Sequence, residues 1–257
     1  MNFDRVLAII LRNYFLTIHQ LERFTDLLLF PIVGLLLWGF FAQYVGIESA
    51  LASFLVGGLI FWTIFERVGS GIGIDFMWDI WEHNLMNVLA SPITLIEHIG
   101  GLVIVAILKV LVSLAAMLIL AGFVYGFNLA TLGSSLALLW INVVLFAVVL
   151  GIFNVAVVLR FGHIVGPLTW VLPFAIQPFS AAFYPVSVLP QVIQKIVWFL
   201  PLSHVFEGMR YTFKTGKLDA NNLLVALILN LIYFALAVAF FIYMFHLTRK
   251  KGSIVKL

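Results

Sequence analysis

Six long apolar stretches divide this chain, and each has enough residues to cross a lipid bilayer. They lie near 26–45, 51–75, 98–123, 132–158, 163–184 and 222–246. A helix needs about 20 apolar residues to cross about 30 Å of hydrocarbon. Apolar and polar residues do not alternate within the stretches, which excludes a membrane β-barrel. The sequence therefore predicts an all-α integral membrane protein, with six transmembrane helices in a single domain over 1–257.

The composition supports this class and excludes several others. Only 10% of the residues are charged, whereas soluble domains have roughly 25%. The chain has no cysteine, which excludes disulfides, thiolate metal sites and cysteine nucleophiles. Its six histidines are scattered and form no H-E-x-x-H sequence, so we expect no metal site. We interpret the net charge of +3 as a topology signal and expect no nucleic-acid partner.

The first 25 residues predict a helix that lies in the membrane interface. Apolar side chains recur at helical spacing over 2–22, at Phe3, Val6, Leu7, Ile10, Leu11, Tyr14, Phe15 and Ile18. Polar side chains lie mostly opposite, as in helices that rest on lipid head groups. A simple extension of the first span is the alternative. Arg5, Arg12 and Arg23 interrupt the apolar residues, so we expect no secretory signal.

Basic residues predict the orientation in the membrane. An even number of spans puts both termini on one side. That side would carry eight basic residues, at Arg5, Arg12, Arg23, Arg160, Arg249, Lys250, Lys251 and Lys256. The opposite side would carry four, at Lys195, Arg210, Lys214 and Lys217. Basic residues are enriched in cytoplasmic loops. We therefore expect a protein of the cell (inner or plasma) membrane with both termini, and residues 76–97, in the cytoplasm.

Prolines mark an unusual region after the fifth stretch. Six of the eight prolines lie between 167 and 201, and proline ends or kinks helices. The segments 186–200 and 203–214 are too short to span but too apolar for a free loop. We expect them to form two short helices that dip into the outer leaflet, which makes 186–214 an outer re-entrant unit.

The segment "WEHNLMNVLASPIT", residues 81–94, is polar and amphipathic in an otherwise apolar chain. Trp81, Leu85, Val88 and Leu89 share one helical face, and Pro92 ends the helix. A short amphipathic helix at the tip of two spans can fit a groove on a soluble partner. An interfacial loop with one helical turn is the alternative.

Three charged residues lie inside the predicted spans and away from the span ends, at Glu66, Arg67 and Lys109. Such a charge costs about 2.5–3.5 kcal/mol at the bilayer centre, so it should find a partner or water. The distances along spans two and three allow a pair between Glu66 and Lys109. We hypothesise that these groups line a transport route, with a structural ion pair or snorkelling of Arg67 as the alternative.

Two segments resemble the membrane permeases of type-2 ABC transporters. Residues 81–94 resemble the cytoplasmic coupling helix of these permeases. Residues 179–213, "FSAAFYPVSVLPQVIQKIVWFLPLSHVFEGMRYTF", resemble the family's signature after the fifth span. The matching residues are Phe183, Pro185, Leu189, Pro190, Pro201, Leu202, His204, Glu207 and Arg210. With the N-terminal helix and the six spans, the resemblance covers nearly the whole chain.

The resemblance implies a permease subunit of an ABC exporter that is not itself an enzyme. Two permeases, identical or paralogous, would pair, and each would engage a separate ATPase that holds ATP and Mg²⁺, so no cofactor is expected in this chain. The implied docking residues are Trp81, Glu82, His83, Asn84, Leu85, Asn87, Ser91 and Pro92. The implied outer gate consists of Phe183, Pro185, Pro190, Pro201, His204, Glu207 and Arg210. The substrate would be amphipathic, lipid-like or drug-like.

The residues agree with a separate ATPase. The chain has no G-x-x-x-x-G-K-[ST] loop, and "GSGIG" at 69–73 lacks the lysine. Small residues such as Gly69, Gly71 and Gly73 instead allow close helix packing in membranes. Two other classes remain open: a proton-coupled secondary transporter that uses Glu66 and Lys109, and a membrane enzyme that acts on lipids. The first lacks an internal repeat, and the second lacks polar residues that converge at one depth.

Overall fold

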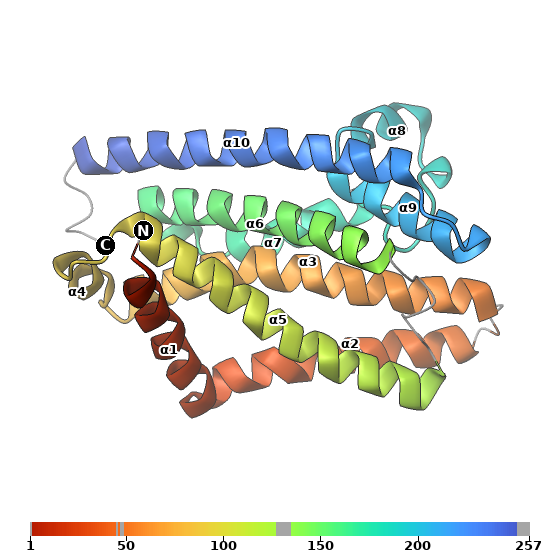
Figure 1. Cartoon of the computed structure of the whole chain (residues 1–257), viewed down its shortest axis with the longest axis horizontal. Helices are drawn as coiled ribbons and strands as arrows, with labels where there is room; N and C mark the ends of the chain where they lie inside the picture. Colours follow the sequence, from red (N-terminus) through yellow and green to blue (C-terminus); the bar gives the residue numbers. More distant parts are fainter. Residues whose placement is uncertain (1, 45, 47–48, 127–134, 251–257) are drawn as a thin grey trace.

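A computed structural model describes residues 2–44, 46, 49–126 and 135–250. The expected start of the fourth span at 132–134, and the tail residues Lys251 and Lys256, lie outside the described residues. Within those ranges the regular structure is entirely helical (Figure 1). The α-helices are α1 Phe3–His19, α2 Leu21–Tyr44, α3 Ser49–Trp81, α4 Leu85–Ala90, α5 Leu95–Tyr125, α6 Ser135–Phe161, α7 Leu168–Ile176, α8 Gln191–Val197, α9 Pro201–Thr215 and α10 Ala220–Lys250. Three 3₁₀ segments are η2 Gly162–Val165, η3 Gln177–Phe179 and η4 Val186–Val188.

Five of the helices in the described part of the chain are long and apolar enough to cross a membrane. They are α2, the 54–81 part of α3, α5, α6 and α10. Each coincides with one of the expected spans, and the five run along the long axis of the molecule (Figure 1). The chain is therefore an all-helical, multi-pass membrane protein.

The segment expected to form the fifth span, 163–184, is not one continuous helix. It consists of η2, the nine-residue α7 and η3, with turns between and after them. Pro167, Pro173 and Pro178 explain the interruptions, because each proline lacks a backbone donor. The segment still connects two ends of the molecule, since α6 finishes near α4 while α8 and α9 lie at the far end (Figure 1). The count of six spans stays a prediction.

Helix α3 lies at the centre of the fold and packs against α6, α5, α2 and α7. Its buried side chains include Phe61, Phe65 and Phe76. Close approach to α6 requires a glycine at Gly73, where an added Cβ would lie 2.8 Å from the Cβ of Asn154. Glycine 69 is similarly close to α6. Gly71 is different, because a Cβ there would meet only Ala106 at 3.9 Å.

The N-terminal helix α1 confirms the helix expected over 2–22. It packs against α5 with one face, formed by Val6, Ile9, Asn13 and Thr17. Asn13 and Thr17 satisfy their side chains on carbonyls of their own helix. The opposite face exposes apolar side chains, at Phe3, Leu7, Leu11, Tyr14, Phe15 and Ile18. Its contact with lipid stays a prediction that this exposed apolar face supports.

Different helices lie at the two ends of the molecule. Helix α1, helix α4 and the end of α10 lie at one end, which we call the coupling end; α8 and α9 lie at the other, which we call the outer end (Figure 1). The two short helices expected over 186–214 are present as α8 and α9. Their depth in the membrane and the side on which each end lies stay predictions.

Candidate functional site

The coupling end is built by a tight connection between α3 and α5. Helix α3 continues past the expected end of its span at 75, as far as Trp81. The chain then turns at His83, whose φ of 53° is in the left-handed region, and forms the six-residue helix α4. Thr94 starts α5 with a capping box that includes Glu97. The segment 81–94 is therefore a turn, a short helix and a second turn between two long helices.

The predicted docking residues do not all face outward. Trp81, Glu82, His83, Asn87 and Pro92 are exposed, as expected for contact with a partner. The remaining three are Asn84 and Ser91, which are half-buried, and Leu85, which is buried.

Leu85 is only 3% exposed and belongs to the hydrophobic core, so in this structure it packs against the protein, and its role as a docking contact stays a prediction. The apolar face of the helix anchors it to the protein. Met86, one position further, is 45% exposed and was missed.

Ion pairs connect this end of α3 to the N-terminal helix. Asp79 is almost fully buried and pairs with Arg12 of α1 and with His98 of α5, whose Nε2 lies 2.9 Å from Asp79 Oδ2. Arg5 of α1 pairs with Glu97, with 3.4 Å between Nη1 and Oε2. The sequence analysis used these arginines only as topology signals. Helix α1 is therefore held against α3 and α5 by charged contacts as well as by packing.

Arg23, at the start of α2, joins the coupling connection to the membrane interior. Its Nη2 donates to Glu82 Oε1 at 3.1 Å, and its Nη1 lies 3.7 Å from Asp75 Oδ1. Its guanidinium also lies over the ring of Trp78. Asp75 and Asp79 are four residues apart and hence share one face of α3, a spacing that could have indicated these partners.

The pair between Glu66 and Lys109 that the distances along the helices allow is not formed, because both side chains have other partners. Lys109 Nζ donates to both oxygens of Asp75, at 2.8 and 2.9 Å. Glu66 Oε2 lies 3.1 Å from Nε of its neighbour Arg67, and Arg67 Nη1 donates to Asp26 at 2.7 Å. Lys109 of α5 therefore still pairs with α3, but at Asp75, while Glu66 is paired with its neighbour Arg67.

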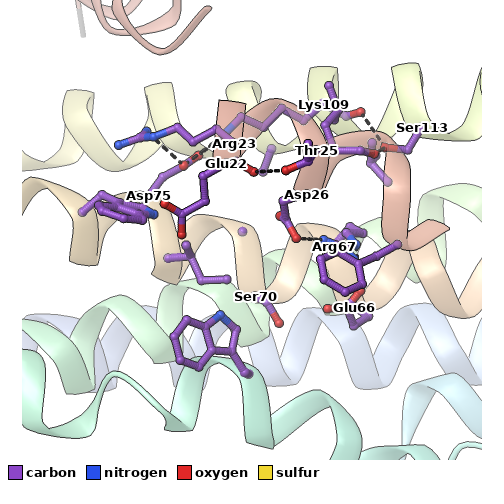
Figure 2. A pocket seen from close by; sticks show the side chains of 18 of the residues that line it. Glu22, Arg23, Thr25, Asp26, Glu66, Arg67, Ser70, Asp75, Lys109 and Ser113 are labelled. Atoms are coloured by element: carbon purple, nitrogen blue, oxygen red, sulfur yellow. Dashed lines mark hydrogen bonds and ion pairs between the residues drawn. The ribbon is translucent and has the colours of Figure 1, made fainter. Parts of the chain in front are cut away.

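These charged groups nevertheless line one cavity of about 550 Å³ between α2, α3, α5 and α7. Figure 2 shows the labelled side chains of Asp26, Arg67, Asp75 and Lys109 around this space, with Asp26 and Arg67 joined. Glu66 is also part of the wall. The hypothesis that Glu66, Arg67 and Lys109 line a route thus stays open, with a different pairing.

Charged contacts also organise the outer end. Arg210 of α9 pairs with Glu207 one turn earlier, a spacing that brings two side chains of a helix together, with 2.8 Å between Nη1 and Oε1. Arg210 Nη2 donates to the carbonyl of Ala181 at 3.1 Å, and the guanidinium lies over the ring of Phe54. Glu207 accepts from the backbone N–H of Val186 at 2.7 Å. The pair fastens the Pro-rich segment to α9 and α3.

The other predicted gate residues shape the same unit. His204 lies with Nε2 2.7 Å from the carbonyl of Trp198 and Nδ1 3.0 Å from Asn222 Oδ1. Phe183 stacks on Trp38 of α2. Each of the three prolines lies at the start of a helix: Pro185 precedes η4, Pro190 precedes α8, and Pro201 begins α9. Their common role in the structure is to define the turns and helix starts of the outer end.

No group of three or more histidine, aspartate or glutamate side chains in the described ranges could hold a metal ion. The expectations that the chain binds neither a metal nor a cofactor stay predictions.

A comparison with family models gives a match to the model described as ABC-2 type transporter, over residues 1–214. The matched range includes α1, α4, the charged cavity and all but the last residue of α9. A comparison with curated proteins gives no match.

Proposed function

The chain belongs to the ABC-2 type transporter family and is a membrane permease, and from this premise we propose that it works in an ATP-driven exporter. In the proposed assembly two permease copies, or this chain and a paralogue, pair in the cell membrane. Each engages a separate ABC ATPase, and the ATPases hold ATP and Mg²⁺. The observation that carries the proposal is the family match, because it includes α1 and α4 of the coupling end and nearly all of α8 and α9 at the outer end.

The ATPase would dock on the exposed face of the coupling connection. This face includes Trp81, Met86 and Asn87, while Leu85 packs inward and fixes the orientation of α4. The exposed side chains of this face offer mainly apolar and amide surface, with Glu82 and His83 beside it. A docked ATPase could therefore displace α4 without first breaking its anchor to the core.

A displacement of α4 would pass to the spans through the charged contacts described above. Glu82 is bound to Arg23 at the start of α2, and Asp79 is bound to α1 and α5. Closure of the ATPase pair on ATP would thus favour one arrangement of four helices over another. This is a shift between two populations caused by differential binding, with no chemistry in this chain.

The outer end would control release of the substrate on the far side of the membrane. The Glu207–Arg210 pair holds the Pro-rich segment on α9 and α3, so opening there requires movement of a fastened unit. With both termini in the cytoplasm, this unit would face outward. A proton-coupled transporter is less well supported, because the Glu66–Lys109 pair on which it relied is replaced by the pairs of Lys109 with Asp75 and Glu66 with Arg67.

The test is co-purification with an ABC ATPase. The chain is co-expressed with each candidate ATPase as the wild type, as Met86→Asp and as Val192→Asp. Both variants place a carboxylate at an exposed apolar position on a short helix, but Val192 lies on α8 at the outer end. We expect Met86→Asp to reduce the recovered ATPase at least tenfold and Val192→Asp to leave it unchanged.

Two results would contradict the proposal in different ways. Equal recovery with both variants would place the ATPase contact somewhere other than α4. Failure of every ATPase to associate with the intact, monodisperse wild type would remove the ATP-driven function itself.

A further inference from the structure

We propose that the charged cavity is a binding site for a hydrophobic organic cation, which would be the class of substrate that this permease moves. The inference rests on the proposed function for the transport step only, since binding to the cavity is a property of this chain alone. The cavity has a volume of about 550 Å³, which is within the range of sites for small organic molecules.

The charges on the cavity wall do not balance. Four carboxylates line it, Glu22, Asp26, Glu66 and Asp75, and only three cationic side chains do so. Among the described residues the Glu22 side chain has no ion-pair partner, and a single guanidinium, that of Arg67, serves both Asp26 and Glu66. The wall therefore carries an excess of negative charge, which a cation would neutralise.

The cations of the wall are already engaged, which argues against an anionic ligand. Lys109 donates to both oxygens of Asp75. Arg23 contacts Asp75 and Glu82, which itself lies outside the cavity wall. An anion would have to displace one of these carboxylates, and breaking a buried pair leaves an unpaired charge at considerable cost. A cation adds to the existing pairs and displaces nothing.

Aromatic side chains form the opposite wall. Trp170 and Phe174 of α7 line the cavity, and both rings are about half exposed. Aromatic faces attract cations, most strongly where water is excluded. The rings of Phe30 and Trp78 already lie against Arg67 and Arg23. The α7 rings are thus the ones that can receive the apolar part and the charge of a ligand.

Buried polar atoms without partners give an independent indication of a ligand. The Oγ of Ser70 is buried and has no hydrogen-bond partner, and the same is true of Nε of Arg23. Both residues are more than nine-tenths buried and line the cavity. Buried polar groups are nearly always satisfied. These unsatisfied atoms on two residues of the cavity wall are positions where a polar group of a ligand would be stabilised once the side chains turn toward it.

The test uses two probes of the same shape and opposite charge, tetraphenylphosphonium and tetraphenylborate. The full-length permease, without ATPase, is placed in nanodiscs of zwitterionic lipid, and binding is measured by equilibrium dialysis against empty nanodiscs. We expect saturable binding of tetraphenylphosphonium at one site per chain. Glu66→Gln should weaken it about tenfold, and Trp170→Leu about threefold, as loss of a charge and of a cation–aromatic contact predict.

The matched control is Asp4→Asn, which removes one carboxylate at an exposed position on α1 outside the cavity. It should leave the dissociation constant unchanged. Size-exclusion profiles and thermal unfolding identify any variant that does not fold, and Trp170→Leu keeps the test valid if Glu66→Gln is one of them.

Several results would overturn the inference. These are no saturable binding to the wild type, equal or tighter binding of tetraphenylborate, and dissociation constants that Glu66→Gln and Trp170→Leu leave unchanged. None of them bears on ATPase docking, which is measured by co-purification. A permease that binds its ATPase but no cation would keep the proposed function and lose this substrate class.

Discussion

At the scale of single residues, the contact between Arg12 and Asp79 is the one whose loss we expect to be most costly. The Asp79 side chain is 1% exposed and the Arg12 side chain 27%. Asp79→Asn would leave Arg12 and His98 without their carboxylate. Because one partner is partly exposed, we expect a loss near the lower end for buried pairs, about 3 kcal/mol of unfolding free energy.

A double-mutant cycle checks this value. Asp79→Asn, Arg12→Gln and the double variant are compared by denaturant unfolding in detergent. The double variant should lose less unfolding free energy than the two single variants together, because in the double variant neither position 12 nor position 79 carries an unpaired charge. Strictly additive losses would mean that the two side chains do not interact in solution.

The contacts of individual residues were harder to predict from the sequence than the helices. Charges at membrane depth indicated that Glu66, Arg67 and Lys109 need partners, and the local pair of Glu207 with Arg210 followed from helical spacing. The partners of Lys109 could not be derived, because the rotation of α3 decides whether Asp75 or Glu66 faces it. The burial of Leu85 could not be derived for a related reason: an amphipathic helix has two faces, and the sequence does not say which one packs against the protein.

At the scale of helices, two glycines of α3, two positions apart, allow a test of how closely α3 packs against α6. An added Cβ at Gly73 would lie 2.8 Å from the Asn154 Cβ on α6, whereas one at Gly71 would be in ordinary contact with Ala106. We expect Gly73→Ala to destabilise the fold by about 1–3 kcal/mol through overpacking. Gly71→Ala, the matched control, should be neutral or slightly stabilising, since alanine favours helix.

Thermal unfolding followed by fluorescence-detected size exclusion measures both variants. Equal stability of Gly73→Ala and the wild type would show that α3 and α6 can separate at no cost. Their packing in the core would then be looser than the close contact of Gly73 with Asn154 indicates.

The helices themselves followed closely from apolar length, and the exceptions have local causes. Expected spans and observed helices agree for α2, α3, α5, α6 and α10, and prolines marked the start of α9. The polar end of α3 was missed, because Asp75 and Asp79 ended the apolar pattern without ending the helix. The segment around α7 was expected to be a span on its apolar length, and the prolines within it indicated breaks but not where each helical piece would begin and end.

At the scale of the whole molecule, the absence of native cysteine makes the topology directly testable. Single cysteines are introduced at Ala90, Ile164 and Val188, all exposed positions. We expect a membrane-impermeant maleimide to label only Val188→Cys in intact cells, and Ala90→Cys and Ile164→Cys after permeabilisation. The result follows from both termini being cytoplasmic and from the α7 segment crossing the membrane.

Comparing the labelling of the cysteines at 164 and 188 decides how many times the chain crosses the membrane. Labelling of both from the same side would mean that the segment with α7 does not cross, and the chain would then have five spans. Labelling of Ala90→Cys in intact cells would reverse the expected orientation and place α4 away from any cytoplasmic ATPase.

Helix α3 has a mechanical consequence that follows from its length. Its 33 residues, Ser49–Trp81, include no proline and extend about 50 Å at 1.5 Å per residue. It is therefore longer than the roughly 30 Å of hydrocarbon that it crosses, and a tilt at one end would be amplified at the other. A tilt of about 5° about its coupling end would move its outer tip sideways by about 4 Å, by the geometry of a straight helix. A small change of tilt at the end that carries Trp81 would thus move the opposite end by about the diameter of an atom.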